Sequence, residues 1–411
     1  MLFEYNKKGK LFTFLCLYIA QSIPMSFFST VLPVIMRQQN FSLEMIGMLQ
    51  LLKLPWILKF LWSPGIDRTT RNLNDYKRWI FSSELIYASI ILAVSFLDFQ
   101  TTPYLILCLI VLSFIASATQ DIATDALAVV SFSSKDKSMV NSMQSIGSFS
   151  GAMIGGGLLL LMYSKIGWSN LLPFLAIFVI IALIPLFFFR SSAGSEVYHK
   201  EVKYKKPELD DLLGFFKQKG IYKQIIFLFF YYAGLIGILA MLKPMLVDYG
   251  YNMKEIGIMS GVIGTSIGCL TSFGAGFLVR KIGVFNARII FAALVLFSTI
   301  YFYCLVNYMP INTATLHLGI CTLWGSYGAA TIVVYTTAME SVRKGFEGTD
   351  FTIQTVVTHL SGIIMGVGSG KIAGMISYSG LFCVEICIAT TSLLFILLAF
   401  KRPILKTESD E

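Results

Sequence analysis

The feature that most constrains this chain is a succession of apolar blocks, each long enough to cross a lipid bilayer. A helix needs about 20 apolar residues to span roughly 30 Å of hydrocarbon, where every backbone polar group must be hydrogen-bonded within the segment. Charged residues make up only 13% of the chain. The blocks predict twelve spans, at 11–36, 43–66, 78–97, 103–131, 137–164, 169–189, 221–248, 254–279, 285–306, 312–342, 349–377 and 378–400.

Short patterns recur about half the chain apart. Residues 142–145 (SMQS) correspond to residues 352–355 (TIQT) at an offset of 210 positions, and the Ile-Gly pair at 46–47 recurs at 256–257 at the same offset. Such repeats indicate a duplicated bundle with a substrate site between its halves. We therefore expect an all-α membrane protein, monomeric, with two pseudosymmetric six-helix bundles. The predicted divisions are a bundle at 1–190, a cytoplasmic linker at 191–220, a bundle at 221–402 and a disordered tail at 403–411.

The distribution of basic residues predicts the orientation in the lipid bilayer. Apart from Arg37, Lys165 and Lys254, the lysines and arginines outside the spans fall in the termini and in the loops on the same side as the termini. The positive-inside rule places that side in the cytoplasm. The net charge of +9 therefore indicates topology, not a nucleic-acid partner. In the basic linker, residues 209–216 form an amphipathic stretch that can lie on the membrane surface.

Neither an enzyme nor a cofactor-binding protein is expected. The three histidines are scattered, and the seven cysteines lie in apolar spans without metal-ligand spacing, so no metal site and no cofactor are predicted. The glycine-rich stretch at 366–371 departs from a phosphate-binding loop, because Met365 and Ile372 occupy two of the positions that such a loop requires. A receptor would more often carry a folded soluble domain. Transport driven by an ion gradient is the remaining interpretation.

Ionisable residues inside the spans are candidates for proton coupling, because a charge in lipid costs about 2.5 to 3.5 kcal/mol. Asp121 and Asp125 lie one helical turn apart in the fourth span, and Lys53 and Lys59 lie in the second. Counting ~1.5 Å per residue from the span ends places Lys59 level with Asp125, and both Lys53 and Asp121 deeper. We expect these four residues to form a proton-coupling cluster. The alternative is a permanent structural ion pair.

Polar and aromatic side chains within the spans are candidates for binding a sugar or another bulky polar substrate. The predicted substrate-binding residues are Gln21, Gln120, Gln144, Tyr231, Tyr232, Trp324, Tyr327, Tyr335, Gln354, His359 and Lys371. Packing in the core or at the membrane interface is the alternative for each aromatic residue. Glycines spaced by about one turn in the fifth, eighth and eleventh spans favour a moving seam between the halves over static packing.

Two motifs resemble those of a known family. The sequence KFLWSPGIDR at 59–68 and the sequence QDIATD at 120–125 are similar to signatures of the AmpG-type muropeptide permease and acetyl-coenzyme A transporter family, within the major facilitator superfamily. Residues 65–68 also resemble the superfamily's loop between the second and third helices. By this resemblance Asp67 and Arg68 would form a cytoplasmic latch, Asp121 and Asp125 match the family's acidic positions, and Lys59 matches its lysine.

The resemblance implies a twelve-helix major facilitator fold, alternating access and proton-driven import across a bacterial inner membrane. The expected substrates are muropeptides from the cell wall, together with protons. A siderophore importer and an acetyl-coenzyme A transporter are the alternatives, because the best-known members are longer and carry additional C-terminal helices. Basic residues inside the spans are few, which favours a sugar over a nucleotide.

Overall fold

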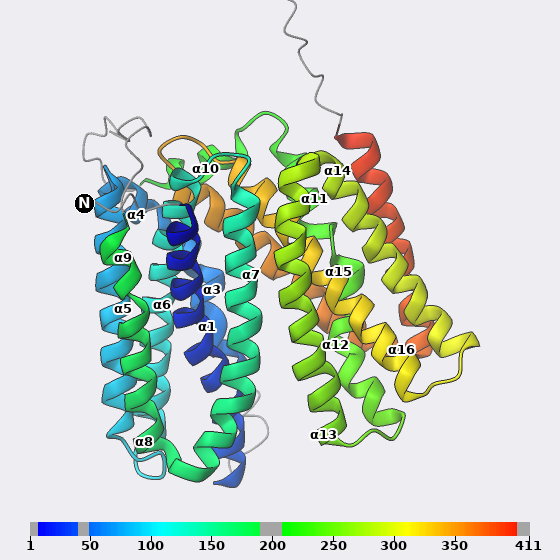
Figure 1. The fold of residues 1–411 in the computed structure, drawn as a ribbon, viewed down its shortest axis with the longest axis horizontal. Helices are drawn as coiled ribbons and strands as arrows, with labels where there is room; N and C mark the ends of the chain where they lie inside the picture. The colour runs from blue at the N-terminus through cyan, green and yellow to red at the C-terminus, as the bar shows by residue number, and fades with distance from the viewer. Residues whose placement is uncertain (1–6, 40–48, 190–207, 401–411) are drawn as a thin grey trace, which may run out of the picture.

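A computed structural model describes residues 7–39, 49–189 and 208–400. Within these ranges the regular secondary structure is helical, without a strand. The helices form two groups that stand side by side, the first running from blue to green and the second from green to red (Figure 1). The predicted tail at 403–411, residues 191–207 of the linker and the first Ile-Gly pair at 46–47 lie outside the described residues.

The first group contains the helices that precede the linker. In chain order they are α1 (Lys7–Gln38), η1 (Leu49–Lys53), α3 (Leu54–Leu58), η2 (Lys59–Leu61), α4 (Ser63–Thr69), α5 (Leu73–Ser95), α6 (Pro103–Ser131), α7 (Lys137–Met153), η3 (Ile154–Leu158), α8 (Leu159–Ala182) and α9 (Ile184–Phe188). The segments η1 and η2 are 3-10 helices, and η3 is a π-helix.

The second group follows the short linker helix α10 (Leu209–Phe216). Its elements are α11 (Ile221–Phe230), α12 (Ala233–Asp248), α13 (Met253–Ile256), the π-helix η4 (Gly257–Gly264), α14 (Thr265–Tyr308), α15 (Thr313–Glu340) and α16 (Glu347–Ala399). The start of α1, α10 and the end of α16 lie on one side of the molecule, at the top of Figure 1. We call this the α10 side.

The observed helices follow the predicted spans closely. Eight helical stretches are long and apolar enough to cross a membrane, and three of them contain 52, 55 and 53 residues. Each of these three is broken near its middle by non-helical backbone, at Gly167, Gly283 and Ser377. Counting these stretches twice gives eleven passes among the described residues. The predicted span at 43–66 is described from Leu49, as short helical pieces.

Local signals in the sequence fix several helix ends. The side chain of Asn72 accepts hydrogen bonds from the backbone at the start of α5, and Asn312 does the same for α15. Pro103 begins α6, where its missing N–H costs nothing. Between α11 and α12 the helix is interrupted at Tyr232, whose φ of −121° and ψ of 17° are not helical, inside the predicted span 221–248. Broken helices of this kind expose backbone and side chains at transport sites.

Large apolar side chains on the outer surface fit a lipid environment. On α8, Phe174, Ile177 and Ile181 are each more than half exposed, and Leu270 and Phe297 on α14 are similarly exposed. Apolar patches of this extent are unusual on soluble monomers. Together with the eight spans, they identify a multi-pass membrane protein.

The glycine runs do not all have the predicted role. A Cβ on Gly147, Gly151 or Gly155 of the α7–η3 segment would approach α1 atoms to 2.6 Å or less, so these glycines allow close packing of two helices in the same half. The expected seam between halves is wrong for this run. Gly268 and Gly276 on α14 do face α7 of the other half, where a Cβ would meet Phe149 and Ser142.

Candidate functional site

A cavity of about 440 Å³ lies between the two halves. Such a volume is in the range of sites for small organic ligands. Both halves contribute to its wall, which consists of Tyr18, Gln21, Ser22, Met25, Ser26, Trp56, Ile57, Lys59, Asp121, Asp125, Gln144, Ser145, Ser148, Phe149, Tyr232, Ile236, Tyr327, Thr331, Tyr335, Thr355, Thr358, His359, Gly362 and Ile363. Six of the predicted substrate-binding residues and three of the four predicted proton-coupling residues are among them.

A buried ion pair joins Lys59 of η2 to Asp121 of α6 in the wall of this cavity. Both side chains are at most 5% exposed. Gln21 of α1 donates a hydrogen bond of 2.8 Å to the second oxygen of Asp121, and the Lys59 ammonium lies 5.3 Å from the centre of the Trp56 ring. Both Asp121 oxygens are therefore satisfied, which is what a buried carboxylate requires.

Asp125 lies one turn further along α6 and is only partly satisfied. Its Oδ1 accepts a hydrogen bond of 2.8 Å from the Tyr18 hydroxyl and a longer one of 3.4 Å from Gln144. Its Oδ2 is buried without a hydrogen-bond partner. We call Lys59, Asp121 and Asp125 the coupling cluster. Because one lysine serves two carboxyl groups, the cluster carries a surplus negative charge unless a proton is bound.

The sequence-based depth count placed Lys59 level with Asp125, and the Lys59 ammonium reaches Asp121, one turn away from Asp125 on α6. The second span is not a continuous α-helix, because the 3-10 segments η1 and η2 interrupt it. A 3-10 helix rises about 2.0 Å per residue instead of 1.5 Å, and it turns side chains to different directions. The Lys53 side chain lies outside the described residues, so its predicted role stays a prediction.

The second half presents aromatic and hydroxyl groups to the same cavity. Tyr232, at the break between α11 and α12, packs edge-on against Tyr327 of α15, with ring centres 5.6 Å apart. Tyr335 of α15 faces the coupling cluster, and His359 of α16 has a buried Nδ1 without a hydrogen-bond partner. These four predicted residues are brought together. At the 210-residue offset, Asp125 corresponds to Tyr335, so the acidic pair has no acidic equivalent in the second half.

Five predicted substrate-binding residues lie outside the cavity wall. Tyr231 donates a hydrogen bond of 2.8 Å to the backbone carbonyl of Arg288. Gln354 accepts a hydrogen bond from Gln224 and donates to the carbonyl of Ala338. These two side chains stabilise the packing of the second half.

The other three residues also point elsewhere. Lys371 is exposed on α16. Trp324 packs edge-on against Phe149, which lines the cavity, but Trp324 itself does not line it. Gln120 is fully buried on a different face of α6 from Asp121. The helix that carries each residue was predicted correctly, but the direction of the side chain depends on how that helix is rotated in the bundle. Sequence reasoning also missed Tyr18, Trp56 and Phe149, which looked like ordinary apolar positions.

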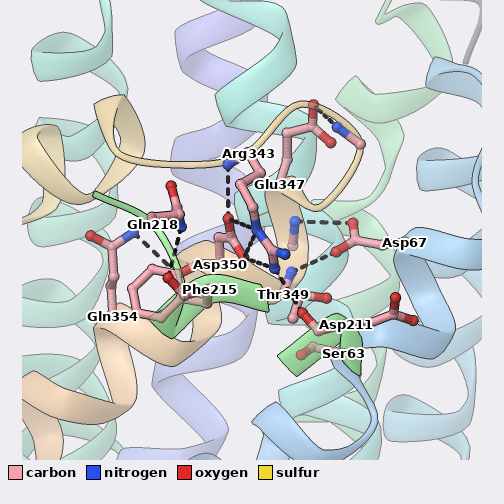
Figure 2. Close-up of polar contacts among 12 residues, drawn as sticks. Ser63, Asp67, Asp211, Phe215, Gln218, Arg343, Glu347, Thr349, Asp350 and Gln354 are labelled. Carbon is pink, nitrogen blue, oxygen red and sulfur yellow. Dashed lines mark hydrogen bonds and ion pairs between the residues drawn. The ribbon is translucent and has the colours of Figure 1, made fainter. Parts of the chain in front are cut away.

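On the α10 side, Asp67 of α4 connects the first half to the second. It is fully buried, and its two oxygens accept hydrogen bonds from the backbone N–H groups of Gly348, at 3.0 Å, and Thr349, at 2.6 Å (Figure 2). These N–H groups belong to the first turn of α16, where the helix dipole favours a negative charge. We call this contact the latch.

Arg68, the other predicted latch residue, forms its ion pair with Asp211 of α10, and its guanidinium lies 5.4 Å from the centre of the Phe346 ring of the second half. Arg343, in the loop before α16, donates a hydrogen bond of 2.7 Å to the backbone carbonyl of Asp211. Arg343 also pairs with Asp350 through two of its nitrogens, at 2.6 and 2.9 Å (Figure 2). We call Arg68, Asp211, Arg343 and Asp350 the α10 clasp.

Residues 209–216 form a helix, as predicted, and the clasp fixes it to the rest of the protein. Leu213 and Phe216 are more than half exposed on this helix, and its contact with the membrane surface stays a prediction. Asp211 and Phe215 are buried, and α10 is held between loops of the two halves. Burial opposes ionisation of Asp211, but the hydrogen bonds from Arg68 and from the Glu208 N–H outweigh it, so the pKa of Asp211 lies below its ordinary value of 3.8.

Further hydrogen bonds join the halves along α7, starting from its α10-side end. Lys137 donates to the carbonyl of Met339 at 2.6 Å, Ser138 donates to the carbonyl of Gly276 at 2.9 Å, and Asn141 donates to the Thr336 hydroxyl at 3.2 Å. All three donors are at most 9% exposed. With the latch and the clasp, they separate the cavity from the α10 side.

Comparisons with known proteins agree with this architecture. The sequence model of the Major Facilitator Superfamily matches residues 11–366. The anhydromuropeptide permease of Escherichia coli K12 is 22% identical over 390 residues, which cover 93% of this chain and 78% of the permease. Putative transporter AmpG 3 of Rickettsia prowazekii is 26% identical over 416 residues, 95% of each chain.

Solved structures show the same fold at low sequence identity. A bacterial homologue of the iron transporter ferroportin, in an outward-facing state, superposes with a TM-score of 0.70 at 14% identity, over 96% of this chain and 99% of its own. The human organic anion transporter MFSD10 superposes with a TM-score of 0.74 at 10% identity, over 95% and 99%. The chain therefore belongs to the major facilitator superfamily, as an AmpG-like transporter and not an enzyme.

Proposed function

We propose that this protein imports anhydromuropeptides from cell-wall turnover across a bacterial inner membrane, together with protons. The observation that carries the proposal is the coupling cluster, which lies in the wall of a cavity between the two halves. The similarity to the anhydromuropeptide permease supports the choice of substrate.

Proton coupling follows from the charge balance of the cluster. Lys59 balances Asp121, and Asp125 is left with a buried oxygen that has no partner. A carboxyl group in this position is stable when it binds a proton. When substrate enters, the Lys59 ammonium can leave Asp121 and bind the substrate instead. The acidic pair then loses its balancing positive charge, and the proton on Asp125 compensates that loss. A permanent ion pair without proton exchange is the alternative.

The contacts between the halves support alternating access. The latch, the clasp and the bonds from α7 hold the α10 side closed. By the positive-inside rule this side is cytoplasmic, so the described conformation faces outward. Import then requires these contacts to break as the halves rock, which moves the cavity from one face of the membrane to the other.

The chemistry of the wall supports a sugar-containing substrate. Four tyrosines, Trp56 and several hydroxyl groups line the cavity, and its charged residues are those of the coupling cluster. Flat aromatic faces and hydroxyls suit sugar rings, whereas the phosphates of coenzyme A need several convergent basic groups. Among the described lining residues, Lys59 is the single Lys or Arg, and Asp121 already pairs with it. This favours the muropeptide over the acetyl-coenzyme A alternative.

The test is transport by the purified protein in proteoliposomes. Labelled anhydromuropeptide should accumulate when a proton gradient is imposed, and dissipating the gradient should abolish accumulation. The Asp125→Asn variant should lose gradient-driven accumulation and keep exchange of labelled for unlabelled substrate, because exchange needs no net proton movement. Uptake of a ferric siderophore in place of the muropeptide would favour the second candidate, and full accumulation by Asp125→Asn would refute the coupling role.

A further inference from the structure

A second buried carboxyl group lies in the first half, away from the cavity. Glu84, in the middle of α5, is fully buried, and neither of its carboxyl oxygens has a hydrogen-bond partner. It does not line the cavity. A carboxyl group at this depth is costly whether or not it is charged, so its presence needs a reason.

A stripe of polar groups on α6 lies next to Glu84. Ser117, Gln120 and Thr124 are spaced by three and four residues and therefore share one face of α6. All three are fully buried, and the Ser117 hydroxyl, both polar atoms of the Gln120 amide and the Thr124 hydroxyl lack hydrogen-bond partners. Helix α5 packs along α6, and the Tyr87 phenol of α5 lies near both Glu84 and Ser117.

The stripe leads from Glu84 to the coupling cluster. Gln120 and Thr124 directly precede Asp121 and Asp125 in α6, so the stripe and the acidic pair lie on adjacent faces of the same two turns. Of the other helices that pack against α5, α8 carries Lys165 as its charged residue, exposed, and the charges of α4 belong to the latch and the clasp. The ionisable group near Glu84 is therefore Tyr87, and the acidic pair lies on the adjacent face of α6.

Buried polar groups without protein partners are commonly hydrogen-bonded to internal water. The stripe offers donors and acceptors at successive turns, which is the arrangement that a chain of water molecules needs. We infer that Glu84 is a second proton-binding site, connected to Asp121 and Asp125 by water molecules held along Ser117, Gln120 and Thr124.

The transfer is a simple proton exchange. The proton on the Glu84 carboxyl passes to the first water molecule of the chain. The last water molecule of the chain delivers one proton to the carboxylate of Asp125. Glu84 is left as a carboxylate near the Tyr87 hydroxyl, which can donate a hydrogen bond to it. In the reverse direction the same groups return the proton. This role rests on the proposed proton coupling.

Glu385 provides a contrast within the same molecule. It is also a buried glutamate, on α16 in the second half, and its Oε2 likewise lacks a partner. Its carboxyl lies against Gly237 and near Ser369, whose hydroxyl already donates to the Gly366 carbonyl, and it does not line the cavity. Burial alone would make the two glutamates equivalent, whereas the proposed path distinguishes them.

The experiment is infrared difference spectroscopy of the purified full chain after a step in pH, which requires no substrate. The C=O stretch of protonated carboxyl groups should change with pH and shift in D₂O, and Glu84→Gln should remove the component that belongs to Glu84. Glu385→Gln is the matched control and should leave the signal intact. Loss of the band in Glu385→Gln, or its full retention in Glu84→Gln, would overturn the inference.

One further variant and a transport assay keep the test independent of folding and of the proposed function. Gln120→Leu retains Glu84 but interrupts the stripe, so the carboxyl band should remain and its exchange with D₂O should become slower. Unchanged exchange in Gln120→Leu contradicts the water path. In proteoliposomes, Glu84→Gln should lose gradient-driven accumulation and keep exchange. If Asp125→Asn accumulates substrate normally while the Glu84 band still responds to pH, the transport mechanism fails and the proton site stands.

Discussion

Removing the charge of Asp67 should open the α10 side of the transporter. In the structure its carboxylate accepts two backbone hydrogen bonds at the start of α16. Asparagine has the same shape but offers one acceptor oxygen, and its NH₂ group opposes the second N–H. Hydrogen bonds to a charged group contribute about 1.5 to 3 kcal/mol, and the charge–dipole interaction contributes about 0.3 to 2 kcal/mol.

The expected loss for Asp67→Asn is about 2 to 4 kcal/mol, because the asparagine retains one of the two hydrogen bonds. At 1.4 kcal/mol per factor of ten, this changes the ratio of outward-facing to inward-facing molecules by roughly 30- to 700-fold. The size of the shift in population depends on the wild-type ratio, but its direction is fixed, because the latch exists when the α10 side is closed.

Spin labels at Arg71→Cys and Lys344→Cys would measure the separation of the two halves on the α10 side. These positions lie in exposed loops of opposite halves, and the seven native cysteines must first be replaced. Asp67→Asn should add a population at longer distance. Asp98→Asn, an exposed change in the loop between α5 and α6, is the control. An unchanged distance distribution in Asp67→Asn would refute the latch.

Three further results are expected. Gly151→Val should lower thermal stability, by about 1 to 3 kcal/mol, because a Cβ there would approach the Cβ of Ser22 to 2.3 Å; a melting experiment with Gly157→Ala, where the Cβ meets open space, is the comparison. The stabilisation of the clasp by ionised Asp211 is fully present above the ordinary pKa of 3.8 and is lost as the pH falls through the lowered pKa. Spin-label distances should therefore be equal at pH 7 and pH 5. Lys371→Gln should leave uptake unchanged, because its side chain is exposed outside the cavity; reduced uptake would place it in the substrate path.

The sequence alone located most helices, because helix formation in lipid is decided locally. Every backbone polar group must be paired within its own segment, so a long apolar block becomes a helix whatever surrounds it. The predicted span 103–131 has the bounds of α6, and the predicted stretch 209–216 has those of α10. The identity of the acidic pair could also be predicted, because charged residues in apolar blocks are rare.

Tertiary structure decided which side chains meet. Gln144 and Gln354 occupy equivalent positions in the repeat, yet Gln144 lines the cavity and Gln354 is bonded within the second half. The direction of a side chain depends on the rotation of its helix, and that rotation depends on packing against other helices far away in the sequence.

The same reason explains the ion pair and the linker helix. Lys59 pairs with Asp121, and Asp211 of α10 is buried where Arg68 and Arg343 approach it from different halves. Apolar blocks and intramembrane charges thus determined the fold class and the candidate coupling residues. The partners of those residues were determined by contacts between distant segments, which no local pattern encodes.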